Sequence, residues 1–227
     1  DVGHDRRGHR RAAVARGGAI HLMGLFSEGG VHSSLEHVKA LVRLAGRLGA
    51  TRVFIHAFTD GRDTSPTAGE RYMVEFQDFL ESEGVGEVAT VSGRYYAMDR
   101  DRRWDRLKSA YDALVHGRGL VAPDAVTAIR ESYARGETDE FIVPTIIGDG
   151  VGSRIADGDA VFFFNFRPDR ARELSAALTQ PQCEGFDRGG PPPRIEMAGM
   201  TEYDPNLGLG VAFPKEEPLN VLAEVVS

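Results

Sequence analysis

The chain has 227 residues, of which 41% are hydrophobic, and it carries a formal net charge of −7. This length can bury a sizeable core, as one large domain or as two small ones. The acidic balance argues against broad electrostatic binding to nucleic acid or to an anionic membrane, because both require a basic surface.

Cysteine usage and hydrophobic patterning favour the cytoplasm. Cys183 is the only cysteine, so the chain can form no internal disulfide and a reducing compartment is expected. No apolar run approaches the roughly 20 residues that span a bilayer, and the beginning of the chain lacks the apolar core of a secretory signal. We therefore expect a cytoplasmic protein.

The first 18 residues are set apart by their charge. Five arginines fall between Arg6 and Arg16, and apolar periodicity is weak before the strand that begins at Ile20. A basic arm that contacts phosphate is one interpretation; a poorly ordered terminus, or an extension foreign to the natural sequence, is the one we favour. Residues 1–18 stay unassigned, and residues 19–227 are treated as one domain.

Beyond this arm, strand and helix patterns alternate in the manner of repeated βα units. Strands are expected at residues 20–25, 52–58, 88–92, 141–147, 160–166 and 195–200. Helices are expected at residues 34–48, 67–80, 104–116, 124–135, 171–178 and 219–226. Gly49 should end the first helix, and Ser65 and Pro66 should begin the second. The sequence predicts an α/β fold: a mostly parallel sheet flanked by helices, with ligand loops at the carboxyl ends of the strands.

Four loops share one layout, in which a strand-like run is followed at once by arginine, histidine or aspartate. They are SEGGVHS at residues 27–33, DGRDTSP at 60–66, SGRYYAMDRDRRWDR at 92–106 and FNFRPDR at 164–170. In an open α/β sheet, the loops at the carboxyl ends of the strands line a common crevice where ligands bind. The four loops therefore predict one anion pocket.

The first two loops offer an imidazole and a carboxylate. His32 follows two glycines at a helix start, where it could exchange a proton near neutral pH or simply hydrogen-bond to the helix. Arg62 could grip a carboxylate or phosphate while the adjacent Asp63 accepts a hydroxyl proton. A solvated turn with local salt pairing is the alternative for this second loop.

The other two loops offer guanidinium groups. Arg94 directly follows a strand, whereas Arg100 sits among dense alternating charge that is typical of an exposed helix face. Arg167 and Arg170 follow the most apolar strand, and their spacing of three in a first helical turn should aim both heads the same way. Two forked cations facing one point match a phosphate dianion; a pair of surface arginines is the alternative.

Other motifs argue against self-contained chemistry. The histidines show no spacing typical of a zinc site, and no EF-hand loop is present, so we predict no metal within this chain. The sequence also lacks a GxxxxGK[ST] loop and the GxSxG elbow that carries a hydrolase nucleophile.

The segments HLMGLFSEGGVHS, HAFTDGRDTSP, GEVATVSGRYYAMDRDRRWDR and GDAVFFFNFRPDRARELSAAL resemble, in order and spacing, the cofactor-independent (2,3-bisphosphoglycerate-independent) phosphoglycerate mutases of the alkaline-phosphatase-like superfamily. The resemblance covers nearly everything from Ile20 onward, but only the inserted phosphotransferase domain of those enzymes. It implies that residues 19–227 form a phosphoglycerate-binding domain.

The resemblance also implies a division of labour. The family interconverts 3-phosphoglycerate and 2-phosphoglycerate through a phosphoserine, and the serine and two manganese ions belong to a metal-binding phosphatase-like domain that flanks this one. Neither flank is visible here, so this chain would bind no cofactor and would be inactive alone. It would bind and reorient the glycerate.

Carried over position by position, the resemblance implies roles for seven residues. Those that would hold the glycerate are His32, Arg62, Asp63, Arg94 and Arg100. Asp63 is the candidate proton acceptor for the glycerate hydroxyls, and Arg167 and Arg170 would hold the phosphate. One departure is Ser34, which stands where relatives often have a second histidine.

Two other functions remain open at this point. A stand-alone binding module for small phosphorylated acids would use the same pocket without chemistry of its own. A nucleic-acid binder would use the basic arm and the arginines of residues 94–106, but the acidic balance of the chain disfavours it.

Overall fold

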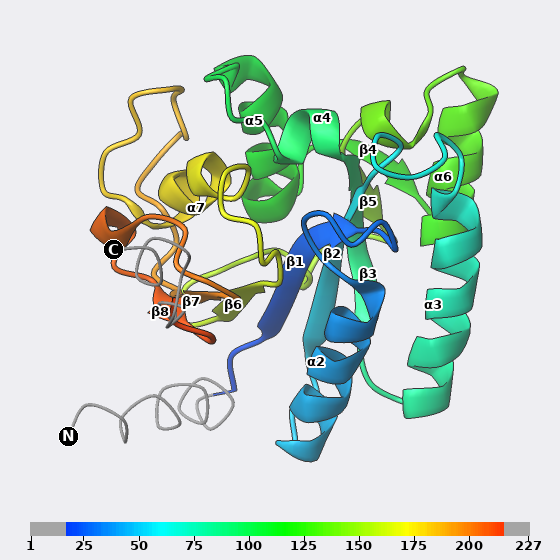
Figure 1. Cartoon of the computed structure of the whole chain (residues 1–227), viewed down its shortest axis with the longest axis horizontal. Helices are drawn as coiled ribbons and strands as arrows, with labels where there is room; N and C mark the ends of the chain where they lie inside the picture. Colours follow the sequence, from blue (N-terminus) through cyan, green and yellow to red (C-terminus); the bar gives the residue numbers. More distant parts are fainter. Residues whose placement is uncertain (1–16, 216–227) are drawn as a thin grey trace, which may run out of the picture.

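The computed structural model describes residues 17–215, so most of the basic arm and the helix expected at 219–226 lie outside the described residues. A mixed sheet runs through the centre in the order β4-β5-β3-β2-β1-β6-β7-β8 (Figure 1). Its strands are β1 (Ile20–Phe26), β2 (Val53–Thr59), β3 (Glu87–Gly93), β4 (Leu120–Ala122), β5 (Thr145–Ile147), β6 (Ala160–Phe163), β7 (Glu196–Gly199) and β8 (Gly210–Val211). Every neighbouring pair is parallel except β3 and β5. The predicted mostly parallel α/β fold is confirmed.

Helices cover both faces of the sheet. They are α2 (Leu35–Arg47), α3 (Gly69–Glu83), α4 (Arg94–Ala97), α5 (Trp104–Tyr111), α6 (Ala125–Ala134) and α7 (Arg172–Thr179). A π-helical turn, η1 (Asp112–His116), continues α5, and two 3-10 turns are η2 (Asp139–Phe141) and η3 (Pro205–Leu207). Among these described helices, none has the length and apolar character needed to cross a membrane.

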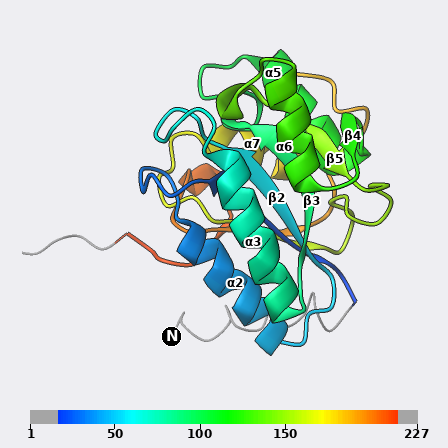
Figure 2. The same cartoon turned by 90° about the vertical axis from the view of Figure 1, so that its right-hand side faces the viewer.

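Two apolar cores lie on opposite faces of the sheet because successive residues of a strand point to opposite sides. Leu22 and Phe26 of β1 belong to one core, with residues of α2, α3 and α6. Met23 and Leu25 belong to the other, with residues of α4, α5 and α7. Figure 2 shows α2, α3 and α6 side by side in front of the sheet. The central strands are covered on both sides, which explains why β2 is buried along its whole length.

The start of α3 differs from the prediction. The helix begins at Gly69, and neither Ser65 nor Pro66 starts it. Instead, the backbone N–H of Gly69 donates to the Asp139 carboxylate at 2.8 Å. A Cβ at position 69 would lie 2.6 Å from that carboxylate, so glycine is required there. A residue 70 positions away therefore caps this helix, and no local pattern could have shown it.

Two predicted strands also differ in their boundaries, and two short strands were not predicted. The strand expected at 141–147 is reduced to β5, and η2 occupies its beginning. The strand expected at 160–166 ends at Phe163. Beyond it, the backbone N–H of Leu25 in β1 donates to the side-chain oxygen of Asn165 at 2.8 Å and not to a backbone carbonyl of β6, so the strand pairing stops. The short strands β4 and β8, of three and two residues, were missed since so few residues show no periodicity.

Candidate anion-binding site

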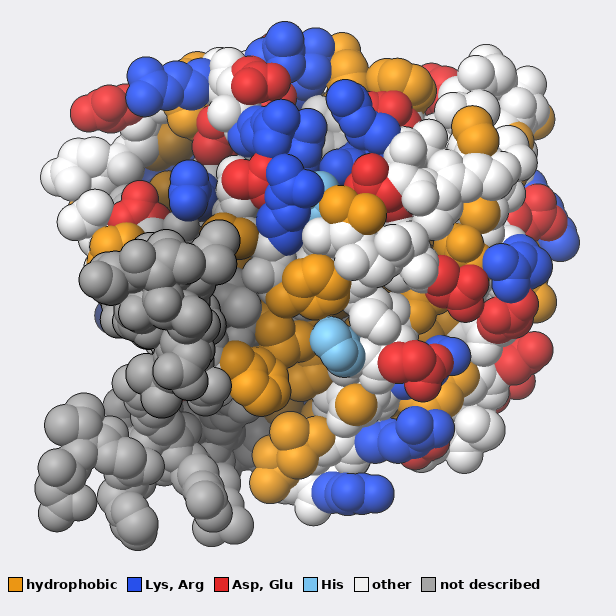
Figure 3. All heavy atoms as spheres, in the orientation of Figure 1, with side chains coloured by type: hydrophobic (Ala, Val, Ile, Leu, Met, Phe, Trp, Pro, Cys, Tyr) orange, Lys and Arg blue, Asp and Glu red, His pale blue; other side chains and the backbone are white. Residues whose placement is uncertain are grey.

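The four loops predicted to meet do so at one edge of the sheet. They follow β1, β2, β3 and β6, which are consecutive and mutually parallel in the sheet. Their carboxyl ends therefore face the same way, as the topology of an open parallel sheet requires. In the space-filling view, Lys and Arg side chains gather over this edge, interspersed with Asp and Glu (Figure 3).

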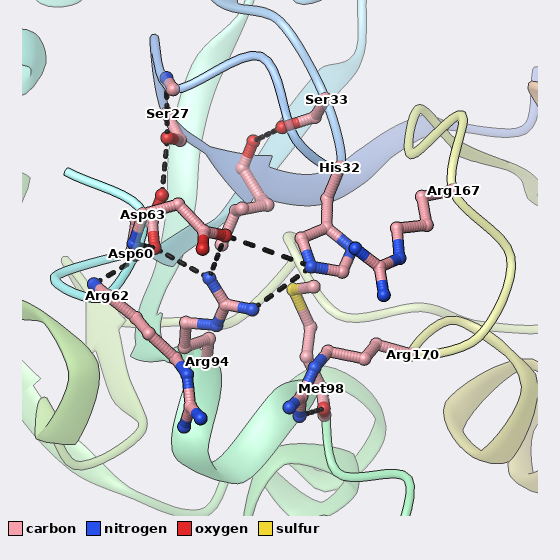
Figure 4. A network of polar contacts seen from close by, with 12 residues as sticks. Ser27, His32, Ser33, Asp60, Arg62, Asp63, Arg94, Met98, Arg167 and Arg170 are labelled. Carbon is pink, nitrogen blue, oxygen red and sulfur yellow. Dashed lines mark hydrogen bonds and ion pairs between the residues drawn. The ribbon is translucent and has the colours of Figure 1, made fainter.

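Arg94 is the centre of a buried group that we call the inner cluster, formed by His32, Asp60, Asp63 and Arg94. The Arg94 side chain is only 3% exposed. Its Nη1 donates to Asp60 Oδ1 and to Asp63 Oδ2, each at 2.6 Å, and its Nη2 donates to His32 Nε2 at 3.1 Å (Figure 4). One guanidinium thus joins three loops.

The contact with Arg94 fixes the protonation of His32. Because a guanidinium can only donate, His32 Nε2 must accept, and the ring proton sits on Nδ1. Burial, and then the positive charge of Arg94, lower the pKa of His32 to about 4, although Asp169 opposes them. His32 is therefore neutral at pH 7. Its buried Nδ1–H has no hydrogen-bond partner among the described residues, and Asp169 Oδ1 lies 3.8 Å away.

Asp60 belongs to the site although sequence reasoning missed it. Burial by itself raises the pKa of Asp60, but hydrogen bonds from the Asp63 backbone, Ser27 and Arg94 outweigh it and lower the pKa. Ser27 Oγ donates at 2.5 Å, and the backbone N–H groups of Arg62 and Asp63 donate at 3.1 and 3.0 Å. Such hydrogen bonds, from backbone N–H groups two and three residues further along the chain to an aspartate side chain, are typical of an Asx turn. That signal in DGRD could have revealed Asp60.

A second group, the rim cluster, consists of Arg100, Arg167 and Asp169. Arg167 Nε and Nη2 donate to the Asp169 carboxylate at 2.9 and 3.1 Å, and Arg100 Nη1 donates to the same carboxylate at 2.5 Å. The side chains of Arg167 and Arg100 are 45% and 43% exposed. Sequence reasoning found both arginines but missed Asp169, which lies between Arg167 and Arg170 in the sequence.

Arg170 lies between the two clusters. Its Nη1 donates to the backbone carbonyl of Met98 at 2.9 Å, and its side chain enters from the same side as Arg167 in Figure 4. Burial, followed by the charges of Arg94, Arg100 and Arg62, lowers the pKa of Arg170. α7 begins only at Arg172, so the expected placement of Arg167 and Arg170 in a first helical turn is wrong. Arg167 instead donates to Asp169, and Arg170 to Met98.

Arg62 turns away from its neighbour Asp63. The Asp63 carboxylate faces Arg94, and its Oδ2 lies 3.8 Å from His32 Nε2. The Arg62 side chain is 59% exposed and its Nη1 lies 3.4 Å from Glu140 Oε1. The two adjacent residues therefore serve different parts of the site: Asp63 its interior and Arg62 its edge.

The backbone behind the site is tightly packed. η2 lies so close to two of the loops that a Cβ at Gly61 would be 2.7 Å from the backbone nitrogen of Glu140, and a Cβ at Gly93 would be 2.3 Å from its carbonyl oxygen. Thr59 Oγ1 also donates to the backbone carbonyl of Asp139 at 2.7 Å. These contacts hold the loops that carry Arg62 and Arg94 against one short turn.

The arrangement suits an anion with several oxygens. It combines five arginines, a neutral imidazole N–H and two carboxylates, Asp63 and Asp169, that are partly open to solvent. Within residues 17–215, no group of three or more His, Cys, Asp or Glu side chains could hold a metal ion. The site can thus bind and orient an anion and can offer a carboxylate for proton transfer.

Comparisons with known proteins agree with this geometry. Residues 7–205 match the family described as the BPG-independent PGAM N-terminus, a range that begins within the basic arm. The chain is 53% identical over 216 residues to the 2,3-bisphosphoglycerate-independent phosphoglycerate mutase of Haloarcula marismortui, covering 95% of this chain and 41% of that protein. It is 51% identical over 217 residues to the enzyme of the same name from Myxococcus xanthus, covering 94% and 42%.

A solved structure gives the same result. The fold resembles a Leishmania mexicana phosphoglycerate mutase with a TM-score of 0.88 and 31% identity, covering 99% of this chain and 43% of that one. The chain spans about two-fifths of the length of the curated relatives it matches. On this evidence the chain belongs to the family of the N-terminal domain of BPG-independent phosphoglycerate mutases.

Proposed function

We propose that this chain is the substrate-binding part of a 2,3-bisphosphoglycerate-independent phosphoglycerate mutase, an isomerase of glycolysis. The observation that carries the proposal is the convergence of five arginines and the buried His32 N–H from four loops on one edge of the sheet. Phosphoglycerate carries a phosphate and a carboxylate, and each of these groups matches a forked guanidinium donor.

The two ends of the ligand would be held by different residues. Arg167 and Arg170 would bind the phosphate, since their side chains enter the site from one side. The residues proposed to hold the glycerate are His32, Arg62, Asp63, Arg94 and Arg100. Of these, His32 can donate from Nδ1, and Arg94 is fixed by its contacts to two carboxylates. A side chain that is already held in place loses little conformational entropy when the ligand binds.

Asp63 is the proposed proton acceptor for the glycerate hydroxyls. Its Oδ2 accepts from Arg94 at 2.6 Å, so the carboxylate is held in one orientation, and the side chain remains 22% exposed. A general base must lie within hydrogen-bond reach of the proton that it removes. Asp63 is the carboxylate of the inner cluster that meets this requirement, because Asp60 is buried and occupied by four donors.

The covalent step would belong to the remaining part of the enzyme. From the family resemblance, we assign the serine nucleophile and two manganese ions to a metal-binding, alkaline-phosphatase-like domain of the same protein. Bound metal ions would activate the serine and stabilise charge on the phosphoryl group. The present chain would retain the glycerate while the phosphoryl group is on the serine and would then reorient it. A cytoplasmic location follows from this role.

Calorimetry with 3-phosphoglycerate tests the binding role directly, with D-glycerate and inorganic phosphate as partial ligands. We expect this chain to bind 3-phosphoglycerate more tightly than either part, because the proposed site spans both. The full-length protein should interconvert 3- and 2-phosphoglycerate without added 2,3-bisphosphoglycerate. Binding without turnover in the full-length protein would instead favour a stand-alone module for phosphorylated acids, and absence of binding to both proteins would reject the proposal.

A further inference from the structure

Asp169 forms ion pairs with Arg100 and Arg167, two of the arginines that the proposed function assigns to ligand binding. Its two carboxylate oxygens accept three N–H groups, two from Arg167 and one from Arg100. A carboxylate bound side-on by one guanidinium and end-on by another makes the same contacts that a phosphate or carboxylate ligand would make. In this structure the rim cluster is therefore charge-paired internally.

The hold on Asp169 is weak compared with the hold on Asp60. The Asp60 side chain is 1% exposed and is anchored by two backbone N–H groups and a serine hydroxyl as well as by Arg94. The Asp169 side chain is 24% exposed, and among residues 17–215 it is hydrogen-bonded only by the two guanidinium groups. It also lies in the irregular segment between β6 and α7.

His32 adds an independent indication that a ligand oxygen belongs here. Its Nδ1–H is buried, has no hydrogen-bond partner among the described residues, and lies 3.8 Å from Asp169 Oδ1. That distance is too long for a hydrogen bond. A buried donor without an acceptor is costly, so an anion that moved in beside His32 would gain a contact that Asp169 does not supply.

We propose that Asp169 is an exchangeable counter-ion. In the unliganded protein it offsets part of the positive charge of Arg100 and Arg167 and keeps their side chains at the rim. When an anionic ligand binds, the Asp169 carboxylate releases part of these contacts to the ligand oxygens. The inference rests on the proposed function for the identity of the ligand. Its consequence is that Asp169 lowers the affinity for the anion and speeds its release.

Asp169→Asn tests this because asparagine keeps the shape of the side chain and removes its charge. The full-length protein should be titrated with 3-phosphoglycerate and, separately, with inorganic phosphate. We expect the dissociation constant of each probe to fall about three- to tenfold, the range that two partly exposed ion pairs represent. Dissociation of 3-phosphoglycerate should slow correspondingly in a stopped-flow displacement experiment.

Asp101→Asn is the matched control. Asp101 is an exposed carboxylate that directly follows Arg100 in the chain; its side chain pairs with Arg103 at 3.0 Å, and among the described residues it forms no ion pair with Arg100 or Arg167. Asp101→Asn removes one negative charge, as Asp169→Asn does, so it reports any general electrostatic effect on binding. We expect its dissociation constants to match those of the unchanged protein.

A thermal melt of each variant, without anion and with inorganic phosphate, keeps the test independent of folding. The phosphate-induced rise in Tm should be larger for Asp169→Asn than for the unchanged protein. Weaker or equal binding of phosphate by Asp169→Asn would overturn the proposal, because Asp169 would then be a brace or a bystander. Tighter binding of phosphate together with no binding of 3-phosphoglycerate would support the counter-ion and reject the proposed function, and absence of binding of both probes would reject both.

Discussion

The inner cluster and the rim cluster use the same chemistry, arginine paired with aspartate, in opposite ways. In the inner cluster, Arg94 is buried, and its partner Asp60 is held by further hydrogen bonds from Ser27 and the Asp63 backbone. In the rim cluster, Arg100 and Arg167 are nearly half exposed and share one carboxylate. Burial makes the first arrangement a fixed part of the fold, whereas exposure to water leaves the second free to exchange partners. A site of this kind can be rigid where it orients a ligand and adaptable where it captures one.

The largest effect on stability should come from Arg94→Ala. Removing this cation leaves Asp60 buried and reduces its charge compensation, which typically costs about 3–5 kcal/mol. Urea denaturation of the chain measures the loss. Arg130→Ala is the control, because its exposed pair with Glu70 should be worth no more than about 1 kcal/mol. Similar losses in both variants would mean that burial does not separate the two kinds of pair.

Asp63→Asn should separate binding from catalysis within the inner cluster. Asparagine can still accept from Arg94, so binding of 3-phosphoglycerate should change little. Loss of the proposed proton acceptor should lower kcat of the full-length enzyme about 100-fold or more. Steady-state kinetics and calorimetry on the same preparation measure the two effects. A loss of affinity as large as the loss of kcat would argue that Asp63 only positions Arg94.

Arg167→Ala should affect binding more than folding. The proposed contact to phosphate is charge-assisted, so its loss should weaken binding of 3-phosphoglycerate by about 2 kcal/mol. Stability should fall by less than about 1 kcal/mol, because the pair with Asp169 is partly exposed. The matched control is Arg194→Ala, which removes an exposed arginine paired with Asp157. An unchanged dissociation constant for Arg167→Ala would remove this residue from the proposed site.

A pH dependence of stability should arise from His32. Its folded pKa of about 4 lies below the ordinary value of 6.5, so its contribution to stability is complete above pH 6.5 and is lost as the pH falls toward 4. Burial also lowers the pKa of His21 and of His56, so His32→Gln should flatten the acid loss of stability without abolishing it. Denaturation midpoints between pH 4 and 7 measure the slope.

Asp139 should act in the opposite direction over a similar range. Burial raises its pKa to about 6, so its folded form binds a proton more readily than the unfolded form does. Its contribution to stability is therefore present below about pH 3.8 and is lost as the pH rises through 6. Asp139→Asn should make the stability of the chain fall more steeply as the pH drops from 6 to 4. A profile identical to that of the unchanged chain would contradict the raised pKa.

The parts of the molecule that were predicted correctly depend on local patterns. The alternation of strand and helix periodicity sufficed for the α/β fold, and the family resemblance is confirmed. The meeting of the four loops followed from topology, since parallel strands end at the same edge. Gly49 follows α2 in the left-handed conformation, as expected for a helix that ends there. The roles assigned to individual site residues stay predictions.

The parts that were missed depend on contacts between distant residues. Asp60 meets Arg94 across 34 positions, and Asp139 caps α3 across 70. Arg62 lies beside Glu140, which is 78 positions away. Asp169 was overlooked for a different reason. A carboxylate between two arginines in RPDR is most simply interpreted as a local ion pair, and only the structure shows that Arg100 also donates to it.

The positions of Arg62 and Arg94 in the proposed site depend on the close packing of Gly61 and Gly93 against η2. Gly61 and Gly93 carry no charge and touch no proposed ligand, yet any side chain there would collide with the backbone of Glu140 and push Arg62 or Arg94 out of place. A mutational survey restricted to charged positions would overlook them. Substitutions in the helical turn at 139–141 could likewise shift Arg62 or Arg94 and so change ligand specificity, although no residue of that turn is proposed to contact the ligand.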